Sequence, residues 1–165
     1  MARILATDGL DSGCVEILLE RGHHVDMKHF ERSELLEGAI SGYDVIIIRS
    51  ATKLDSEVLT ANTSRKSRIR LIVRAGVGLD NIDLEKASEL GILVKNTPTA
   101  STKAVVEFTI GHLLTGVRNI SKADRAMRSS EWAKKSSRGT ELSGKNLGLV
   151  GYGRISKGVA EIARL

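Results

Sequence analysis

The chain has 165 residues, a formal net charge of +5 and a hydrophobic fraction of 41%. This length allows one domain, or a small domain with part of a second, and recurring runs of Ile, Leu and Val argue against a disordered chain. No apolar run is long enough to cross a membrane, and the first residues become polar too soon for a signal peptide. We therefore expect a cytoplasmic protein. Its single cysteine, Cys14, lies among apolar residues at helical spacing and is expected to be a buried structural thiol.

The positive charge raises the possibility of a nucleic-acid partner, and the best local support is the basic run at residues 65–70. No aromatic side chain is interleaved there for base stacking, and the run leads directly into an apolar strand. We therefore favour a solvated loop or helix end over a nucleic-acid site. The charge fits an anionic small-molecule substrate at least as well.

Short apolar runs alternate with amphipathic segments through the first part of the chain. The expected strands are residues 4–7, 23–28, 44–49, 71–75 and 92–94. The expected helices begin near residue 11 and cover residues 30–40, 55–61 and 84–90, ending near Gly22, Gly42 and Gly91 where a glycine follows. The run at residues 44–49 does not alternate with polar residues, which indicates burial on both faces. This repeated β-α order predicts an open, doubly wound parallel sheet.

Pro98 marks a boundary, after which the pattern becomes helical. We expect a long helix from Ser101 or Thr102 through Val117, a second at residues 120–127, and a polar stretch at residues 129–145. Residues 146–150 have the pattern of a short buried strand.

A glycine turn follows this expected strand. Gly151, Gly153 and Ser156 have G-x-G-x-x-S spacing, and an amphipathic helix begins at once. A strand, a glycine turn and a helix start can present backbone N–H groups to the pyrophosphate of a dinucleotide. Because the first β-α-β unit of such a domain needs about thirty residues, we expect this chain to be the front part of a longer enzyme.

Two candidate anion-binding clusters follow strands of the predicted sheet. Residues 74–81 (Arg-Ala-Gly-Val-Gly-Leu-Asp-Asn) come directly after one strand, where Gly76 and Gly78 let the backbone approach a ligand closely. Alone, this pattern also fits an ordinary strand-to-helix loop, and a loop- or helix-capping role is expected for Asp80. Arg49 ends a second strand at the same sheet edge, where ligands of open α/β sheets bind. The four histidines show no metal-ligand spacing, so no metal site is expected.

The sequence resembles the D-isomer-specific 2-hydroxyacid dehydrogenases in five segments that follow in the right order. These are residues 49–53 (Arg-Ser-Ala-Thr-Lys), 74–83, 96–98 (Asn-Thr-Pro), Glu107 and 151–155 (Gly-Tyr-Gly-Arg-Ile). The resemblance implies a flavodoxin-like substrate domain at residues 1–97. Residues 98–165 are then hinge helices, which also mediate dimerisation, and the truncated start of a Rossmann NAD-binding domain.

The resemblance implies a role for each matching residue on the substrate side. Gly76, Val77 and Gly78 offer backbone contacts to the substrate carboxylate, and Val77 also lies near the nicotinamide. Arg49 and Arg74 form an anion pocket for a substrate phosphate. Lys134 matches a basic position that can join this pocket from a neighbouring subunit of a homodimer or larger homo-oligomer.

On the cofactor side, the residues that match the pyrophosphate loop are Gly151, Gly153, Arg154 and Ile155. Ser156 replaces the usual third glycine, which allows close packing of the helix on its strand. We expect looser packing there and no loss of NAD binding.

The resemblance places the catalytic arginine, glutamate and histidine beyond residue 165, so no catalytic residue is assigned, and the isolated chain is expected to be inactive. Within the family, the sequence is most similar to enzymes that oxidise 3-phospho-D-glycerate to 3-phosphohydroxypyruvate with NAD in serine biosynthesis. The alternatives are a dehydrogenase of another 2-hydroxy acid (glyoxylate, lactate or erythronate phosphate), a non-catalytic NAD-sensing interaction module, and a genuinely short protein.

Overall fold

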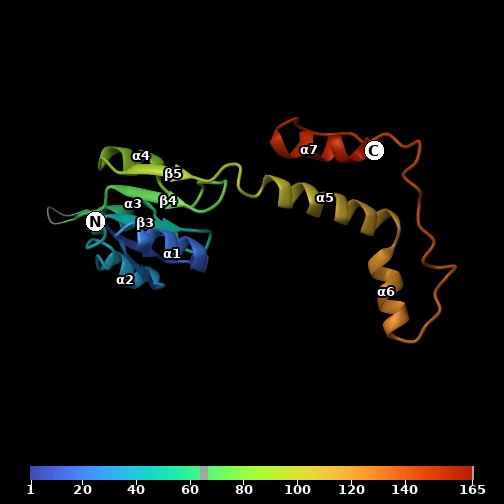
Figure 1. The fold of residues 1–165 in the computed structure, drawn as a ribbon, viewed down its shortest axis with the longest axis horizontal. Coiled ribbons are helices and arrows are strands. Elements are labelled where there is room, and N and C mark those ends of the chain that lie inside the picture. Colours follow the sequence, from blue (N-terminus) through green and yellow to red (C-terminus); the bar gives the residue numbers. More distant parts are fainter. Residues whose placement is uncertain (64–66, 165) are drawn as a thin grey trace. The chain divides into compact units, whose positions relative to one another are not determined.

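The computed structural model describes residues 1–63 and 67–164, and the chain divides into two compact units, Met1–Thr99 and Ala100–Leu165 (Figure 1). The strands of the first unit are Arg3–Ala6 (β1), His24–Met27 (β2), Val45–Ile48 (β3), Leu71–Arg74 (β4) and Leu93–Asn96 (β5). Its helices are Ser12–Glu20 (α1), Arg32–Leu36 (α2), Ser56–Asn62 (α3) and Leu84–Glu89 (α4). The helices of the second unit are Thr102–Val117 (α5), Ile120–Arg128 (α6) and Arg154–Ala163 (α7).

The five strands form one parallel sheet in the order β2-β1-β3-β4-β5. This order is that of flavodoxin-like doubly wound folds. The register pairs Leu5 with Ile46 and Ile46 with Ile72, so these three side chains share one face of the sheet. The sequence-based prediction of a flavodoxin-like parallel α/β sheet is confirmed.

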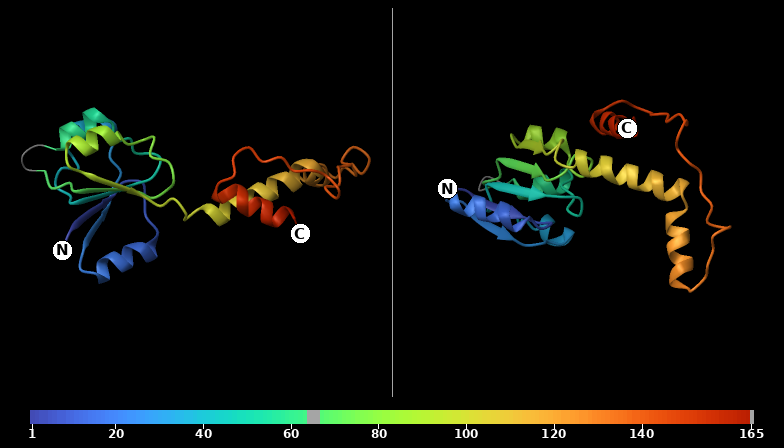
Figure 2. Two further views of the ribbon diagram at one scale, coloured as in Figure 1. Left: turned by 90° about the horizontal axis from the view of Figure 1, so that it is seen from above. Right: turned by 45° about the vertical axis from the view of Figure 1, so that its right-hand side comes forward.

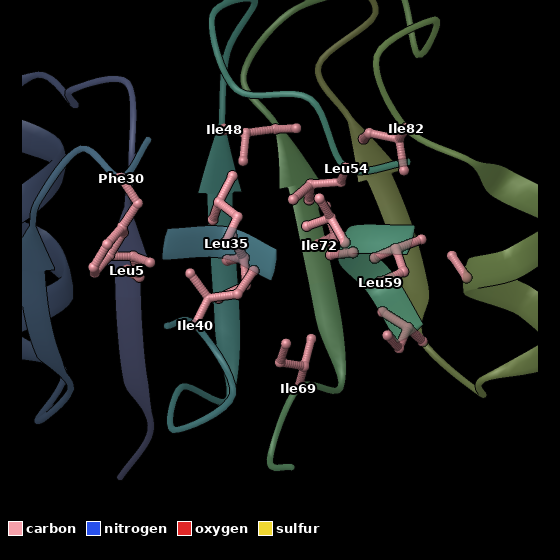
Figure 3. Packing of buried hydrophobic residues seen from close by; sticks show 14 residues of the cluster. Leu5, Phe30, Leu35, Ile40, Ile48, Leu54, Leu59, Ile69, Ile72 and Ile82 are labelled. Carbon is pink, nitrogen blue, oxygen red and sulfur yellow. The ribbon is translucent and has the colours of Figure 1, made fainter. Parts of the chain in front are cut away.

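The main core lies between this face and the helices α2, α3 and α4. Figure 3 shows its apolar side chains packed against the strands, and Leu5, Ile46 and Ile72 are fully buried. Figure 2 shows α1, in blue, on the opposite side of the sheet from α3 and α4. This second face is less completely covered, because α1 has no fully buried residue, Ile47 and Val73 are half-buried and Leu93 is exposed. The expected burial of residues 44–49 on both faces is therefore wrong in this structure.

Aspartates begin three of these helices, as N-capping predicts. A side-chain oxygen of each accepts a backbone N–H from the first turn: Asp11 from Gly13 (3.0 Å), Asp55 from Val58 (3.1 Å) and Asp83 from Lys86 (2.9 Å). Asp83 is therefore the N-cap of α4.

Asn62 joins α3 to α2 through a buried amide. Its Nδ2 donates to the carbonyl oxygens of Leu35 (2.6 Å) and Val58 (2.8 Å), and its Oδ1 accepts the N–H of Ile40 (3.0 Å). The side chain is fully buried and every polar atom of it is used, so it fixes the angle at which the two helices meet.

Two expectations for the first unit are wrong. The helix expected over residues 30–40 ends at Leu36, because Gly38 adopts a left-handed φ of +89° and the N–H of Ala39 bonds back to the carbonyl of Glu34 (3.2 Å). Cys14 is exposed, not buried. Val15 and Leu18 of α1 are half-buried, whereas Cys14, one turn before Leu18, is exposed at the start of the helix.

In the second unit, α5 packs against α7. Val106 of α5 and Val159 of α7 are its buried apolar side chains among the described residues. Gly158 lets the helices approach closely, because a Cβ at this position would lie 2.7 Å from Val106 Cγ2. The long helix after Pro98 therefore packs on the helix that follows the glycine turn.

The buried strand expected at residues 146–150 is wrong. These residues form no strand, and Leu147, Leu149 and Val150 are exposed, Val150 completely. A parallel strand needs a hydrogen-bonded neighbour, and the described part of this unit contains no strand to pair with. Across residues 1–63 and 67–164, no helix has the length and apolar character needed to cross a lipid bilayer.

Candidate functional site

The loops that follow β1, β3, β4 and β5 meet at the carboxyl edge of the sheet, where open α/β folds bind their ligands. The loop after β3 contains Arg49, and the loop after β4 contains residues 75–80. The structure thus brings together the two clusters that the sequence placed at one edge. The links between these loops define the geometry of the candidate site.

Asp8, directly after β1, holds the loop that contains Arg49. Its Oδ2 accepts the backbone N–H groups of Arg49 (2.7 Å) and Thr52 (3.1 Å), and its Oδ1 accepts the hydroxyl of Thr52. Burial alone would raise the pKa of Asp8, but these hydrogen bonds, with one from Thr7, outweigh it and hold the pKa below its ordinary value. Asp8 is therefore a carboxylate at neutral pH.

Asn81 holds the same loop from the other side. Its Nδ2 donates to the carbonyl oxygens of Arg49 (2.8 Å) and Thr52 (2.7 Å), while the N–H of Leu54 donates to the carbonyl of Asn81 (2.8 Å). The backbone of residues 49–54 is thereby fixed between the ends of β1 and β4. The exposed side chain of Arg49 extends from a rigid support.

The glycine loop after β4 is tied to β5 and leaves two N–H groups available. Asn96 Nδ2 donates to the carbonyl of Val77 (2.6 Å), and the N–H of Thr97 donates to the carbonyl of Gly76 (3.0 Å). Within residues 1–63 and 67–164, no hydrogen bond uses the N–H of Val77 or of Gly78. Both residues are exposed, so these donors can bind a carboxylate or phosphate.

Arg49 and Arg74 give this edge its positive charge. In the described part of the chain, neither guanidinium forms an ion pair, and Arg74 Nε is buried without a hydrogen-bond partner. The Arg74 guanidinium lies against Gly76, where a Cβ would overlap Nη1. This edge thus has two guanidinium groups without an ion pair and two unused N–H groups in neighbouring loops, with the Asp80 carboxylate next to Gly78. The positively charged and N–H groups suit an anion with more than one acidic group.

The predicted pyrophosphate loop lies in the second unit. Gly151 adopts a left-handed φ of +84°, and Gly153 is the N-cap of α7, so Arg154 and Ile155 begin the helix. No side chain caps this end of α7, and a Cβ at Gly151 or Gly153 would meet nothing within 4 Å. A helix start without a side-chain cap, and with open space beside its two glycines, fits a pyrophosphate.

Lys134 also lies in the second unit, on an exposed turn after α6. It lines a mainly apolar hollow of about 180 Å³ beside Met127 and Trp132. The candidate substrate residues therefore lie in the first unit, except for Lys134, which shares the second with the glycine loop.

Two further sequence-based expectations concern the basic run at residues 65–70 and Asp80. Arg65 and Lys66 of the basic run lie outside the described residues, whereas Arg68 forms an ion pair with Asp44 (3.1 Å) at the amino edge of the sheet. Asp80 was expected to cap a loop or helix. Instead, its Oδ1 lies next to Gly78, where an added Cβ would be only 2.6 Å away.

Sequence reasoning assigned no role to Asp8, Thr52, Asn81 or Asn96, all of which shape this site. Asn81 and Asn96 lie in the segments that carried the family resemblance, which was the available signal. Asp8 gave no comparable signal, because its partners are 41 and 44 positions away in the chain.

Comparisons with known proteins identify the family of this chain. Residues 4–160 match the family model described as "D-isomer specific 2-hydroxyacid dehydrogenase, catalytic domain". The chain is 40% identical to a hydroxypyruvate reductase of Thermotoga maritima over 162 residues, which are 98% of this chain and 51% of that protein. It is 41% identical to a D-3-phosphoglycerate dehydrogenase of Methanocaldococcus jannaschii over 164 residues, which are 99% of this chain and 30% of that protein.

Among solved structures, the NAD⁺-bound 3-phosphoglycerate dehydrogenase of Entamoeba histolytica is similar to this chain, with a TM-score of 0.76 and 33% sequence identity. The match covers 99% of this chain and 50% of that one. The chain thus spans about half, or less, of the length of these relatives.

Proposed function

Because this chain belongs to the D-isomer specific 2-hydroxyacid dehydrogenase family, we propose that it takes part in the NAD-dependent oxidation of 3-phospho-D-glycerate to 3-phosphohydroxypyruvate. This reaction would place the protein in serine biosynthesis. We propose that the first unit is the substrate domain, and that the second contains the hinge helices and the beginning of the NAD-binding domain.

The observation that carries the choice of substrate is the pair of unpaired arginines at the carboxyl edge. The acid has two anionic groups, a carboxylate and a phosphate. The N–H groups of Val77 and Gly78 suit the carboxylate, and the guanidinium groups of Arg49 and Arg74 suit the phosphate. The name of the Methanocaldococcus jannaschii relative supports the same substrate.

The second unit would bind the cofactor through residues 151–155 at the start of α7. The family resemblance supports a contact of Val77 with the nicotinamide. When bound, NAD accepts the hydride that leaves the substrate. The residues of this chain bind and orient the two molecules. Lys134 would contribute a second positive charge from a neighbouring copy in a homo-oligomer.

The test compares the kcat/KM of several 2-oxo acids, using the full-length protein as it occurs in the cell. NADH-dependent reduction of 3-phosphohydroxypyruvate should have a higher kcat/KM than reduction of hydroxypyruvate, glyoxylate or pyruvate. A preference for an unphosphorylated acid would overturn the choice of substrate. The 165-residue chain alone should show no NADH oxidation, because the resemblance places the acid-base residues outside it; turnover by this chain would contradict that part.

One alternative has support of its own. The Thermotoga maritima relative is named a hydroxypyruvate reductase and is nearly as similar, at 40% identity. Hydroxypyruvate has a carboxylate but no phosphate, so in such an enzyme Arg49 would have no phosphate to bind. Loss of 3-phosphohydroxypyruvate reduction in R49A, with hydroxypyruvate reduction unchanged, would favour the phosphorylated substrate.

A further inference from the structure

Asp8 places a negative charge at the edge of a site whose arginines and unused N–H groups suit anions. A free carboxylate there would repel the substrate. The carboxylate of Asp8 is not free, however, because it accepts the N–H groups of Arg49 and Thr52 across the boundary between β1 and β3. Its contacts therefore act on the shape of the Arg49 loop.

Two buried hydroxyls complete the same network. Thr7 and Thr52 are only 4% and 3% exposed, and their Oγ1 atoms lie 2.8 Å apart. A hydroxyl has one proton, and the carboxylate is the stronger acceptor, so Thr52 donates to Asp8 Oδ1. Thr7 Oγ1 lies 3.1 Å from the same oxygen. Asp8 is thus held by the side chains that flank it and by the loop that it binds.

On the basis of the proposed function, we propose that Asp8 is a positioning residue for substrate binding, which clamps the loop at residues 49–52 so that the guanidinium of Arg49 is held ready for the substrate phosphate. Asp8 does not touch the substrate. It acts through the backbone of Arg49 and Thr52.

Because of this clamp, the loops after β3 and β4 offer different groups to a ligand. Because Asp8 uses the N–H groups of Arg49 and Thr52, the loop after β3 can offer an incoming anion the side chain of Arg49 but not these two backbone donors. The loop after β4 has the opposite arrangement, since the N–H groups of Val77 and Gly78 are available. Each loop therefore recognises a different end of the substrate.

The test is a ¹⁵N NMR titration of the 165-residue chain with 3-phospho-D-glycerate, comparing wild type with D8A, D8N, T52A and T52S. Relative to wild type, D8A should weaken binding by about tenfold, because the loop loses a charged hydrogen-bond acceptor. D8N keeps an acceptor and should bind more tightly than D8A. T52A should be weakened by about threefold, and T52S, which restores the hydroxyl, should bind like wild type.

Asp44 supplies a matched control at the opposite edge of the sheet. It also accepts a backbone N–H, from Arg3 (2.7 Å), and it also belongs to a strand end, but it lies far in the fold from the carboxyl-edge loops. D44A should lose stability without changing affinity by more than about twofold. Equal weakening in D8A and D44A would show a general loss of structure and overturn the proposal.

A second measurement does not need the ligand. Amide hydrogen exchange at Arg49 and Thr52 should be faster in D8N and T52A than in wild type, while exchange at Val73 is unchanged. If D8A does not fold, this comparison still tests whether Asp8 holds the loop at residues 49–52. Unchanged exchange at Arg49 and Thr52 would overturn the proposal. If wild type shows no shift at Val77 and Gly78, the proposed function fails and this inference fails with it. If D8A binds like wild type, only the inference fails.

Discussion

The guanidinium of Arg74 occupies the space that a side chain at residue 76 would need. A methyl group at residue 76 would overlap Arg74 Nη1, which lies at the end of a long and flexible side chain. We expect G76A to displace this guanidinium and weaken binding of 3-phospho-D-glycerate by about tenfold. Because the side chain can move, the free energy of unfolding should fall by less than about 1 kcal/mol. Calorimetric titration and urea denaturation measure the two effects.

Gly42 is the matched control for that substitution, since a Cβ there would lie at an ordinary contact distance of 3.8 Å from Arg3 Nη1. G42A should change neither affinity nor stability appreciably. If G76A binds the acid as tightly as G42A does, the position of Arg74 is irrelevant to binding.

Three aspartates make the fold sensitive to acid. The pKa of Asp44 is lowered chiefly by the backbone N–H of Arg3, with help from Arg68; burial would raise the pKa values of Asp8 and Asp55, but hydrogen bonds outweigh it. A carboxyl group with a lowered pKa in the folded state stabilises the fold fully above its unfolded pKa, and loses that effect as pH falls through its folded pKa. These groups should therefore leave Tm unchanged between about pH 7 and 5 and reduce it below about pH 4.

Thermal denaturation followed by circular dichroism measures this dependence. The D44N variant, whose amide does not titrate, should be less stable than wild type at neutral pH and lose less Tm below about pH 4. An equal acid-induced loss of Tm in the two proteins would show that Asp44 does not contribute.

For single residues, the sequence predicts which side chains lie at the site better than it predicts the hydrogen bonds that hold them there. Arg49, Arg74 and Gly76 lie at or just after strand ends, so their place at the sheet edge is predictable from the sequence. Asp8 could not be assigned, because it binds a backbone more than forty residues away. The exposure of Cys14 depends on which stripe of α1 faces the sheet, and spacing alone did not decide this.

At the level of helices and strands, Asn62 forms a fully buried polar link between α2 and α3. N62A would leave the carbonyl of Leu35 and the N–H of Ile40 buried without this partner and would open a cavity between α2 and α3. We expect the free energy of unfolding to fall by about 3 kcal/mol, as measured by urea denaturation.

Thr60 of the same helix is the control for that loss. Its hydroxyl bonds only to the carbonyl of Ser56 (2.7 Å), and it is exposed. T60A should change stability by less than about 0.5 kcal/mol. A similar small effect in N62A would mean that the buried amide is not important for the packing of α2 on α3.

The order and type of the elements in the first unit could be predicted because capping residues, glycines and apolar runs are local signals. Gly38 ends α2 before Gly42 does, which shows that boundaries depend on which glycine takes a positive φ. Residues 146–150 carry a strand pattern but form no strand, since pairing depends on a neighbour that no local pattern supplies.

At the scale of the whole molecule, the two units differ in how much apolar surface they bury. The first contains a continuous core over the sheet, whereas Val106 and Val159 are the buried apolar residues of the second within the described ranges. Native-state hydrogen exchange should therefore protect amides of β1, β3 and β4 most strongly and those of α6 least. Equal protection of α6 and β3 would contradict this difference.

The central claim is that the carboxyl edge of the first unit binds a phosphorylated 2-hydroxy acid. Its most direct test is a ¹⁵N NMR titration of the wild-type chain with 3-phospho-D-glycerate and, separately, with D-glycerate. We expect shifts at Val77 and Gly78, binding of D-glycerate that is at least about tenfold weaker, and a loss of this preference in R49A. Equal affinity for both acids, or shifts that leave residues 77 and 78 unmoved, would contradict it.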